Sequence, residues 1–161
     1  MKFKYYSKTS EYKRGKNLLI RDFKATRIYQ KWVTDITYIH TQQDGWCYLA
    51  SVMDLFTKKI IGYSFSKNME TQLTIDALTK AYKQQRPGKD LIIHSDRGSQ
   101  YISRLFRNKV KELGLVQSFS NKGNPYDNAV IESFHATLKK EEVNHRKYFN
   151  FKEAYRSIPI H

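Results

Sequence analysis

Cysteine and long apolar runs are scarce in this 161-residue chain, and each scarcity excludes a class of protein. The single cysteine, Cys47, excludes an internal disulfide framework and a zinc site built on cysteines. No stretch approaches the roughly 18 apolar residues that a membrane span needs, and the basic start lacks the apolar segment of a signal peptide. We therefore expect one domain with its own core, in the reducing cytoplasm and without a membrane partner.

Acidic residues are also few. The chain has 15 Asp and Glu against 29 Lys and Arg, a formal net charge of +14, and residues 1–30 carry nine basic against two acidic residues. Such an excess favours a polyanion such as nucleic acid, because each neutralised phosphate releases counterions. We predict a basic N-terminal arm over residues 1–30, with Lys13, Arg14 and Lys16 as candidate DNA contacts. A solvated tail would explain the same composition equally well.

Five short segments have the composition of β-strands. Residues 31–41, 46–55 and 58–65 are rich in β-branched and aromatic residues and are joined by tight turns, which predicts an antiparallel meander. Residues 91–94 and 115–119 are short apolar runs separated from the meander and from each other by helical patterns. Strands connected through helices are parallel, so the sequence predicts an α/β fold: a mixed five-stranded sheet, three antiparallel strands then two parallel, flanked by helices.

Apolar residues at helical spacing predict the helices. Met69, Leu73, Ala77 and Ala81 mark a helix closed by Pro87-Gly88. A second helix is predicted to begin at Ser99 as its N-cap and to end at Gly114, and a short last helix to cover 151–158. The apolar face of the second helix is predicted to be Ile102, Leu105, Phe106, Val110 and Leu113.

One further long helix has a clear start signal at Asn124-Pro125-Tyr126-Asp127, where Asn is a cap and Pro occupies the first helical position. Its spacing places Val130, Phe134 and Leu138 on one apolar face. Glu132 and Lys139 then lie together on the opposite, polar side.

Three carboxylates stand out by position. Asp35 lies within the first strand, where Asp is unusual, Asp96 follows the fourth strand, and Glu132 lies on the polar side of the long helix. If the first and fourth strands are neighbours, the two aspartates lie side by side and the helix can add the glutamate. Such oxygen clusters suit hard cations such as Mg²⁺. An exposed acid on an edge strand is the plainer explanation of Asp35 by itself.

Four sequence blocks resemble the bacterial insertion-sequence transposases that share the catalytic core of retroviral integrases. In that family an acidic triad maps onto Asp35, Asp96 and Glu132, and the 35 residues between the last two match its spacing. The matching blocks are Trp32-Val33-Thr34-Asp35-Ile36-Thr37-Tyr38, Ala50-Ser51-Val52-Met53-Asp54-Leu55-Phe56, His94-Ser95-Asp96-Arg97-Gly98-Ser99-Gln100-Tyr101 and Gly123-Asn124-Pro125-Tyr126-Asp127-Asn128-Ala129-Val130-Ile131-Glu132-Ser133-Phe134.

The resemblance implies a ribonuclease-H-like fold and an integrase-like catalytic core over residues 31–161, shortened at its C-terminal end. It implies a DDE-type polynucleotidyl transferase that cleaves DNA phosphodiesters and transfers strands, with Asp35, Asp96 and Glu132 holding two Mg²⁺ or Mn²⁺ ions. It also implies transposon-end and target DNA as partners, a homodimer or larger synaptic assembly, a possible separate helix-turn-helix protein, and a bacterial, nucleoid-associated location.

Three residues near Glu132 are candidate DNA contacts. Lys139 matches the family's position near the scissile phosphate, and we favour this role over a solvated lysine. An ordinary surface histidine explains His135 at least as well as a DNA contact, and helix-start hydrogen bonding explains Asn128 equally well. Asp54 is assigned to structure. Two alternative functions are an inactive remnant that binds DNA or a partner, and a nuclease of the same fold that does not join strands.

Overall fold

The computed structural model describes residues 30–120, 129–142 and 147–158. All of the predicted basic arm except Gln30 lies outside these ranges, including Lys13, Arg14 and Lys16, as do Asn128 and the predicted helix start at Asn124. The elements are β1 (Lys31–Thr41), β2 (Gly45–Asp54), β3 (Ile60–Ser66), α2 (Thr71–Gln85), β4 (Ile92–Ser95), α3 (Ser99–Ile102), α4 (Arg104–Glu112), β5 (Val116–Phe119), α5 (Ala129–Glu141) and α6 (Phe151–Ser157).

The five strands form one mixed sheet in the order β3-β2-β1-β4-β5. Strand β1 pairs antiparallel with β2, and β2 pairs antiparallel with β3, while β1–β4 and β4–β5 are parallel. The predicted sheet is therefore confirmed, including its switch from antiparallel to parallel pairing. Because β1 lies at this switch, it has a neighbouring strand on each side: β2 along most of its length, and β4 along Lys31–Val33.

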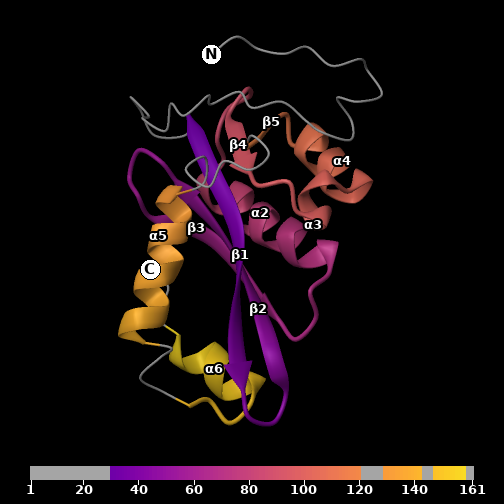
Figure 1. Ribbon diagram of the computed structural model, residues 1–161. Coiled ribbons are helices and arrows are strands. Elements are labelled where there is room, and N and C mark those ends of the chain that lie inside the picture. Colours follow the sequence, from indigo (N-terminus) through magenta and orange to yellow (C-terminus); the bar gives the residue numbers. More distant parts are fainter. Residues whose placement is uncertain (1–29, 121–128, 143–146, 159–161) are drawn as a thin grey trace.

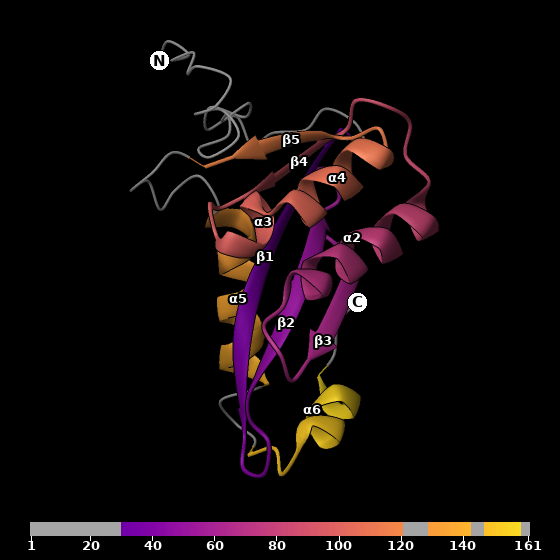
Figure 2. The ribbon, with the colours of Figure 1, turned by 90° about the vertical axis from the view of Figure 1, so that its right-hand side faces the viewer.

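Helices cover both faces of the sheet. Figures 1 and 2 show α2, α3 and α4 on one face and α5 on the other, with α6 at the far end of the β1–β2 hairpin. Side chains of β1 alternate between these layers. Trp32 belongs to the core under α2 and α4, whereas Val33 packs with Ile131 of α5. A third core joins Ile39 to Leu138 and Tyr148.

Two helical predictions were wrong in detail. Met69 lies before α2 rather than in it, and its side chain is exposed. The predicted helix from Ser99 to Gly114 is two helices, because Ser103 has extended backbone and caps α4 by accepting a hydrogen bond from the Phe106 amide at 3.2 Å. This break changes the helical phase, so Leu105 is 64% exposed instead of buried.

Helix α5 is also rotated relative to the predicted apolar face. Ile131, His135 and Leu138 are its buried residues, whereas Val130 and Phe134 are half-buried. The prediction rested on the spacing of apolar residues alone. Burial of His135 shifts the buried face of α5 away from Val130 and Phe134. None of the described helices is long and apolar enough to cross a bilayer.

Candidate active site

Asp35 and Asp96 are brought together by the pairing of β1 with β4. In this parallel pair Val33 is opposite His94. Two residues further along each strand direction lie Asp35, in the middle of β1, and Asp96, directly after β4. Both residues therefore lie just beyond the last registered pair of the two strands, close enough for the charge of Asp35 to act on Asp96. The predicted approach of these two carboxylates thus follows from the observed sheet order.

The loop after β4 fixes the Asp96 side chain. Its Oδ1 accepts a hydrogen bond from the Gly98 amide at 2.8 Å. A Cβ on Gly98 would lie 3.0 Å from that same oxygen, so the turn is close around the carboxylate. Burial, together with the charge of Asp35, raises the pKa of Asp96, although the Gly98 hydrogen bond opposes this.

Glu132 is contributed by a helix rather than by the sheet and lies in the first turn of α5. Its side chain is exposed, in agreement with the predicted polar side of the helix. Partial desolvation and the charges of Asp35 and Asp96 raise the pKa of Glu132, and His135 lowers it. The three acids therefore share one electrostatic environment, in which the charge of Asp35 acts on Asp96 and both of these charges act on Glu132.

The chemistry of this set fits a hard divalent cation. Three carboxylates supply only oxygen donors, and a cation would offset both the desolvation and the repulsion that raise the pKa values of Asp96 and Glu132. Within the described ranges, no three His, Cys, Asp or Glu side chains are arranged to hold a metal ion as they stand.

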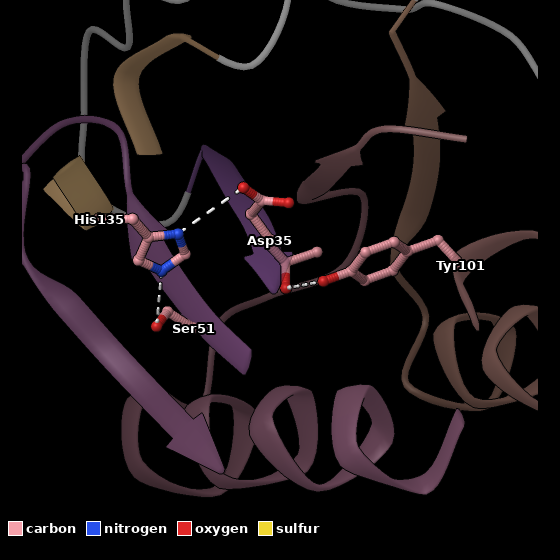
Figure 3. Close-up of polar contacts among 5 residues, drawn as sticks. Asp35, Ser51, Tyr101 and His135 are labelled. Carbon is pink, nitrogen blue, oxygen red and sulfur yellow. Dashed lines mark hydrogen bonds and ion pairs between the residues drawn. The ribbon is translucent and has the colours of Figure 1, made fainter. Parts of the chain in front are cut away.

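His135 is not the surface residue that the sequence suggested. Only 4% of it is exposed, and it lies between α5 and the sheet, beside Asp35. Figure 3 shows the imidazole with one nitrogen toward Asp35 and the other toward Ser51 of β2. Nδ1 is 3.6 Å from Asp35 Oδ2, and Nε2 is 3.1 Å from Ser51 Oγ. This burial places His135 against a carboxylate rather than on a DNA-facing surface.

A tyrosine supports β1 from the other face of the sheet. The hydroxyl of Tyr101, on α3, is 3.2 Å from Thr34 Oγ1 (Figure 3). Burial and then the charge of Asp35 raise the pKa of Tyr101 well above its ordinary value. Residue-level reasoning missed Ser51 and Tyr101 as neighbours of the site. The available signal was that both lie inside the family-like sequence blocks.

Lys139 and Asp54, the other residues singled out in the sequence, lie on a helix and at the end of a strand, respectively. Lys139 is half-buried on α5, seven residues after Glu132 and so on nearly the same side of the helix. Asp54 is buried at the end of β2, and its Oδ2 accepts a hydrogen bond from the Trp32 indole at 3.1 Å. Its Oδ1 accepts from the Phe56 amide at 2.7 Å. Asp54 thus has the structural role assigned to it.

Comparison with known proteins adds a family match. The model of the integrase core domain matches residues 25–125. The chain is 40% identical over 157 residues to the transposase of insertion element IS904 from Lactococcus lactis, covering 98% of this chain and 62% of that protein. It is 43% identical over 143 residues to transposase InsF of IS3A from Escherichia coli, covering 89% of this chain and 49% of the relative.

A 31 kDa protein of insertion element IS600 from Shigella sonnei is 46% identical over 138 residues, covering 86% of this chain and 50% of that protein. The chain thus spans about half to three-fifths of the length of these relatives.

Solved structures share the fold at low sequence identity. An intasome of simian T-cell lymphotropic virus, in complex with a PP2A regulatory subunit, matches with a TM-score of 0.64 at 19% identity, covering 73% of this chain and 41% of that one. The HTLV-2 integrase catalytic core domain in complex with magnesium matches with a TM-score of 0.59 at 18% identity, covering 73% of this chain and 71% of that one. These matches confirm the ribonuclease-H-like fold.

Proposed function

The chain belongs to the integrase core domain family, and from this premise we propose that it is the catalytic core of an insertion-sequence transposase, a DDE-type polynucleotidyl transferase. The observation that carries the proposal is the approach of Asp35 and Asp96 through the β1–β4 register, with Glu132 in the same electrostatic environment. The identity to transposases of bacterial insertion elements supports it.

Asp35, Asp96 and Glu132 would hold two Mg²⁺ or Mn²⁺ ions. Bound there, the cations supply positive charge that stabilises the attacking and departing oxygens of a phosphodiester. The HTLV-2 core, which shares the fold, is described in complex with magnesium.

The chain's own contribution is positioning. Pairing of β1 with β2 positions Asp35, and the turn at Gly98 positions Asp96. Lys139 would bind a DNA phosphate beside the carboxylates, where its charge complements both the phosphate and the acids.

The reaction has two substitutions at phosphorus. Water attacks a phosphodiester at the element's end, the bond from phosphorus to the 3′ oxygen breaks, and that oxygen leaves as a 3′-hydroxyl. The 3′-hydroxyl then attacks a target phosphodiester and displaces another 3′ oxygen, which joins the strands. Neither step requires a covalent enzyme intermediate, so no tyrosine nucleophile is needed.

Three finer features belong to the same proposal. Residues 31–161 form the catalytic core, and residues 1–30 form a basic arm whose Lys13, Arg14 and Lys16 contact DNA, as would Asn128. Strand transfer needs the transposon ends and the target DNA held together, so the protein would act as a homodimer or larger assembly. A separate helix-turn-helix protein would be a further partner. The protein would act at the bacterial nucleoid, where its DNA substrates are.

The test uses the full chain with labelled DNA from the ends of the element that encodes it, in Mn²⁺. Wild type is expected to give nicked and joined products, and Asp96→Asn to bind the DNA without giving either. Equal behaviour of both proteins, with DNA binding intact, would identify an inactive remnant and overturn the proposal. Nicked products without joined ones would identify a nuclease.

A further inference from the structure

His135 is a polar side chain in a place where α5 otherwise presents apolar residues. Its neighbours on the buried face, Ile131 and Leu138, pack against the sheet, yet His135 is equally enclosed at 4% exposed. Nδ1 has no hydrogen-bond partner among the described residues, although it is buried. Enclosing an unsatisfied nitrogen costs free energy, so an apolar residue would stabilise this helix better. The histidine therefore calls for an explanation beyond packing.

The sheet register explains how the imidazole is oriented. Asp35 and Ser51 are directly opposite each other on the antiparallel strands β1 and β2, so their side chains share the face that α5 covers. The imidazole lies between them, with Nε2 3.1 Å from Ser51 Oγ and Nδ1 3.6 Å from Asp35 Oδ2 (Figure 3). Ser51 is fully buried, so water does not compete for this contact.

The donor and acceptor inventory assigns the proton on the ring. An ionised carboxylate only accepts hydrogen bonds, so the nitrogen facing Asp35, Nδ1, carries hydrogen. The Ser51 hydroxyl can either donate to Nε2 or accept from it, and in both cases Nδ1–H is directed at Oδ2. The distance of 3.6 Å is longer than a hydrogen bond, and a small movement of the carboxylate would close it.

We propose that His135 is a positioning residue which, anchored by Ser51, orients the Asp35 carboxylate for binding a divalent cation. The inference rests on the proposed function, because it assigns Asp35 to the metal. By donating to Oδ2, His135 restricts rotation of the carboxylate and leaves Oδ1 available to the cation. Partners of this kind around metal ligands fix ligand orientation, and their loss typically weakens metal binding about 10–100-fold.

Mn²⁺ binding tests the proposal without requiring catalysis. Free Mn²⁺ is measured by electron paramagnetic resonance during titration of the full chain, with Asp96→Asn as the baseline for a damaged site. His135→Leu, which fills the space but removes both nitrogens, should weaken Mn²⁺ binding about 10–100-fold. His135→Asn should recover part of the loss, because its amide nitrogen replaces Nδ1. Ser51→Ala should weaken binding in the same direction but less.

Leu138→Ala is the matched control, because it removes a buried side chain one turn further along α5 without touching Asp35. It should lower Tm while leaving Mn²⁺ affinity unchanged. The proposal is wrong if folded His135→Leu binds Mn²⁺ as wild type does, if His135→Asn binds as poorly as His135→Leu, or if Leu138→Ala weakens binding equally. Failure of wild type itself to bind Mn²⁺ would instead overturn the proposed function.

Discussion

Asp54 and Asp96 offer the same chemical change in opposite settings, and we predict opposite effects of Asp→Asn on stability. Asp54 accepts hydrogen bonds through both oxygens: Oδ2 from the Trp32 indole, and Oδ1 from the Phe56 and Thr57 amides. Asparagine has only one side-chain oxygen that can accept. Its NH₂ group, which only donates, would then face another donor, so one of these hydrogen bonds is lost. At Asp96, the oxygen that accepts from Gly98 is retained in asparagine, and the negative charge that burial disfavours is removed.

The magnitude at Asp54 follows from the burial of Trp32, which is 0% exposed. A buried donor left unsatisfied costs about 1–3 kcal/mol, whereas water can reach the Phe56 amide in its surface turn. In a chain of this size each kcal/mol corresponds to about 2–4 °C in Tm, so Asp54→Asn should lower Tm by about 2–12 °C. Asp96→Asn should leave Tm unchanged or raise it.

The assay is thermal unfolding followed by circular dichroism in EDTA, with DNA nicking measured in parallel. Asp54→Asn should keep activity below its lowered Tm, and Asp96→Asn should lose activity while staying folded. If Asp96→Asn lowers Tm as much as Asp54→Asn does, the carboxylates of the site do not destabilise one another, and the electrostatic reasoning is refuted.

Three further predictions concern packing, metal and DNA. A Cβ on Gly62 would lie 2.6 Å from a carbonyl oxygen of α2, so Gly62→Ala should cost about 1–3 kcal/mol in chemical denaturation. A Cβ on Gly88 would have nothing within 4 Å, so Gly88→Ala should leave the free energy of unfolding unchanged. Equal losses of stability in the two variants would contradict the packing argument. Mg²⁺ should raise the Tm of wild type but not of Asp96→Asn, because only a ligand bound to the native state stabilises it; equal shifts would mean binding elsewhere. Lys139→Ala should weaken DNA binding in filter assays and reduce the salt slope by about one, whereas Lys152→Ala on α6 should change neither.

The fold was largely predictable because its signals are local. The β-branched run of β1 gave both ends of that strand, and the Asp-Gly turn at Asp44 to Gly45, where Gly45 has φ +70°, marked the hairpin. The parallel direction of β4 and β5 followed from general rules on helical crossovers, whereas the strand order that makes β4 a neighbour of β1 came from the structure. Elements defined by their own periodicity and turns could thus be placed without tertiary information.

The site was predictable only in part, for a physical reason. Asp35 stood out because acids are rare inside strands, and Asp96 because of its position directly after the fourth strand. His135 was predicted only as a DNA contact or a surface residue, because its burial depends on how α5 rotates against the sheet, and a histidine gives no hydrophobic signal. The break at Ser103, which exposes Leu105, likewise depends on a local cap competing with a continuous helix.

The position of β1 between an antiparallel and a parallel neighbour has a consequence for how the activity arises as the chain folds. Strand β2 is reached across a short turn, but β4 only after β2, β3 and α2. Pairings distant in sequence form late, because loop closure costs entropy before contacts compensate for it. We expect a nascent or partly folded chain to hold Asp35 without Asp96. The capacity to cut DNA would then arise only with the complete fold, and Mn²⁺ uptake during refolding should lag behind the formation of secondary structure.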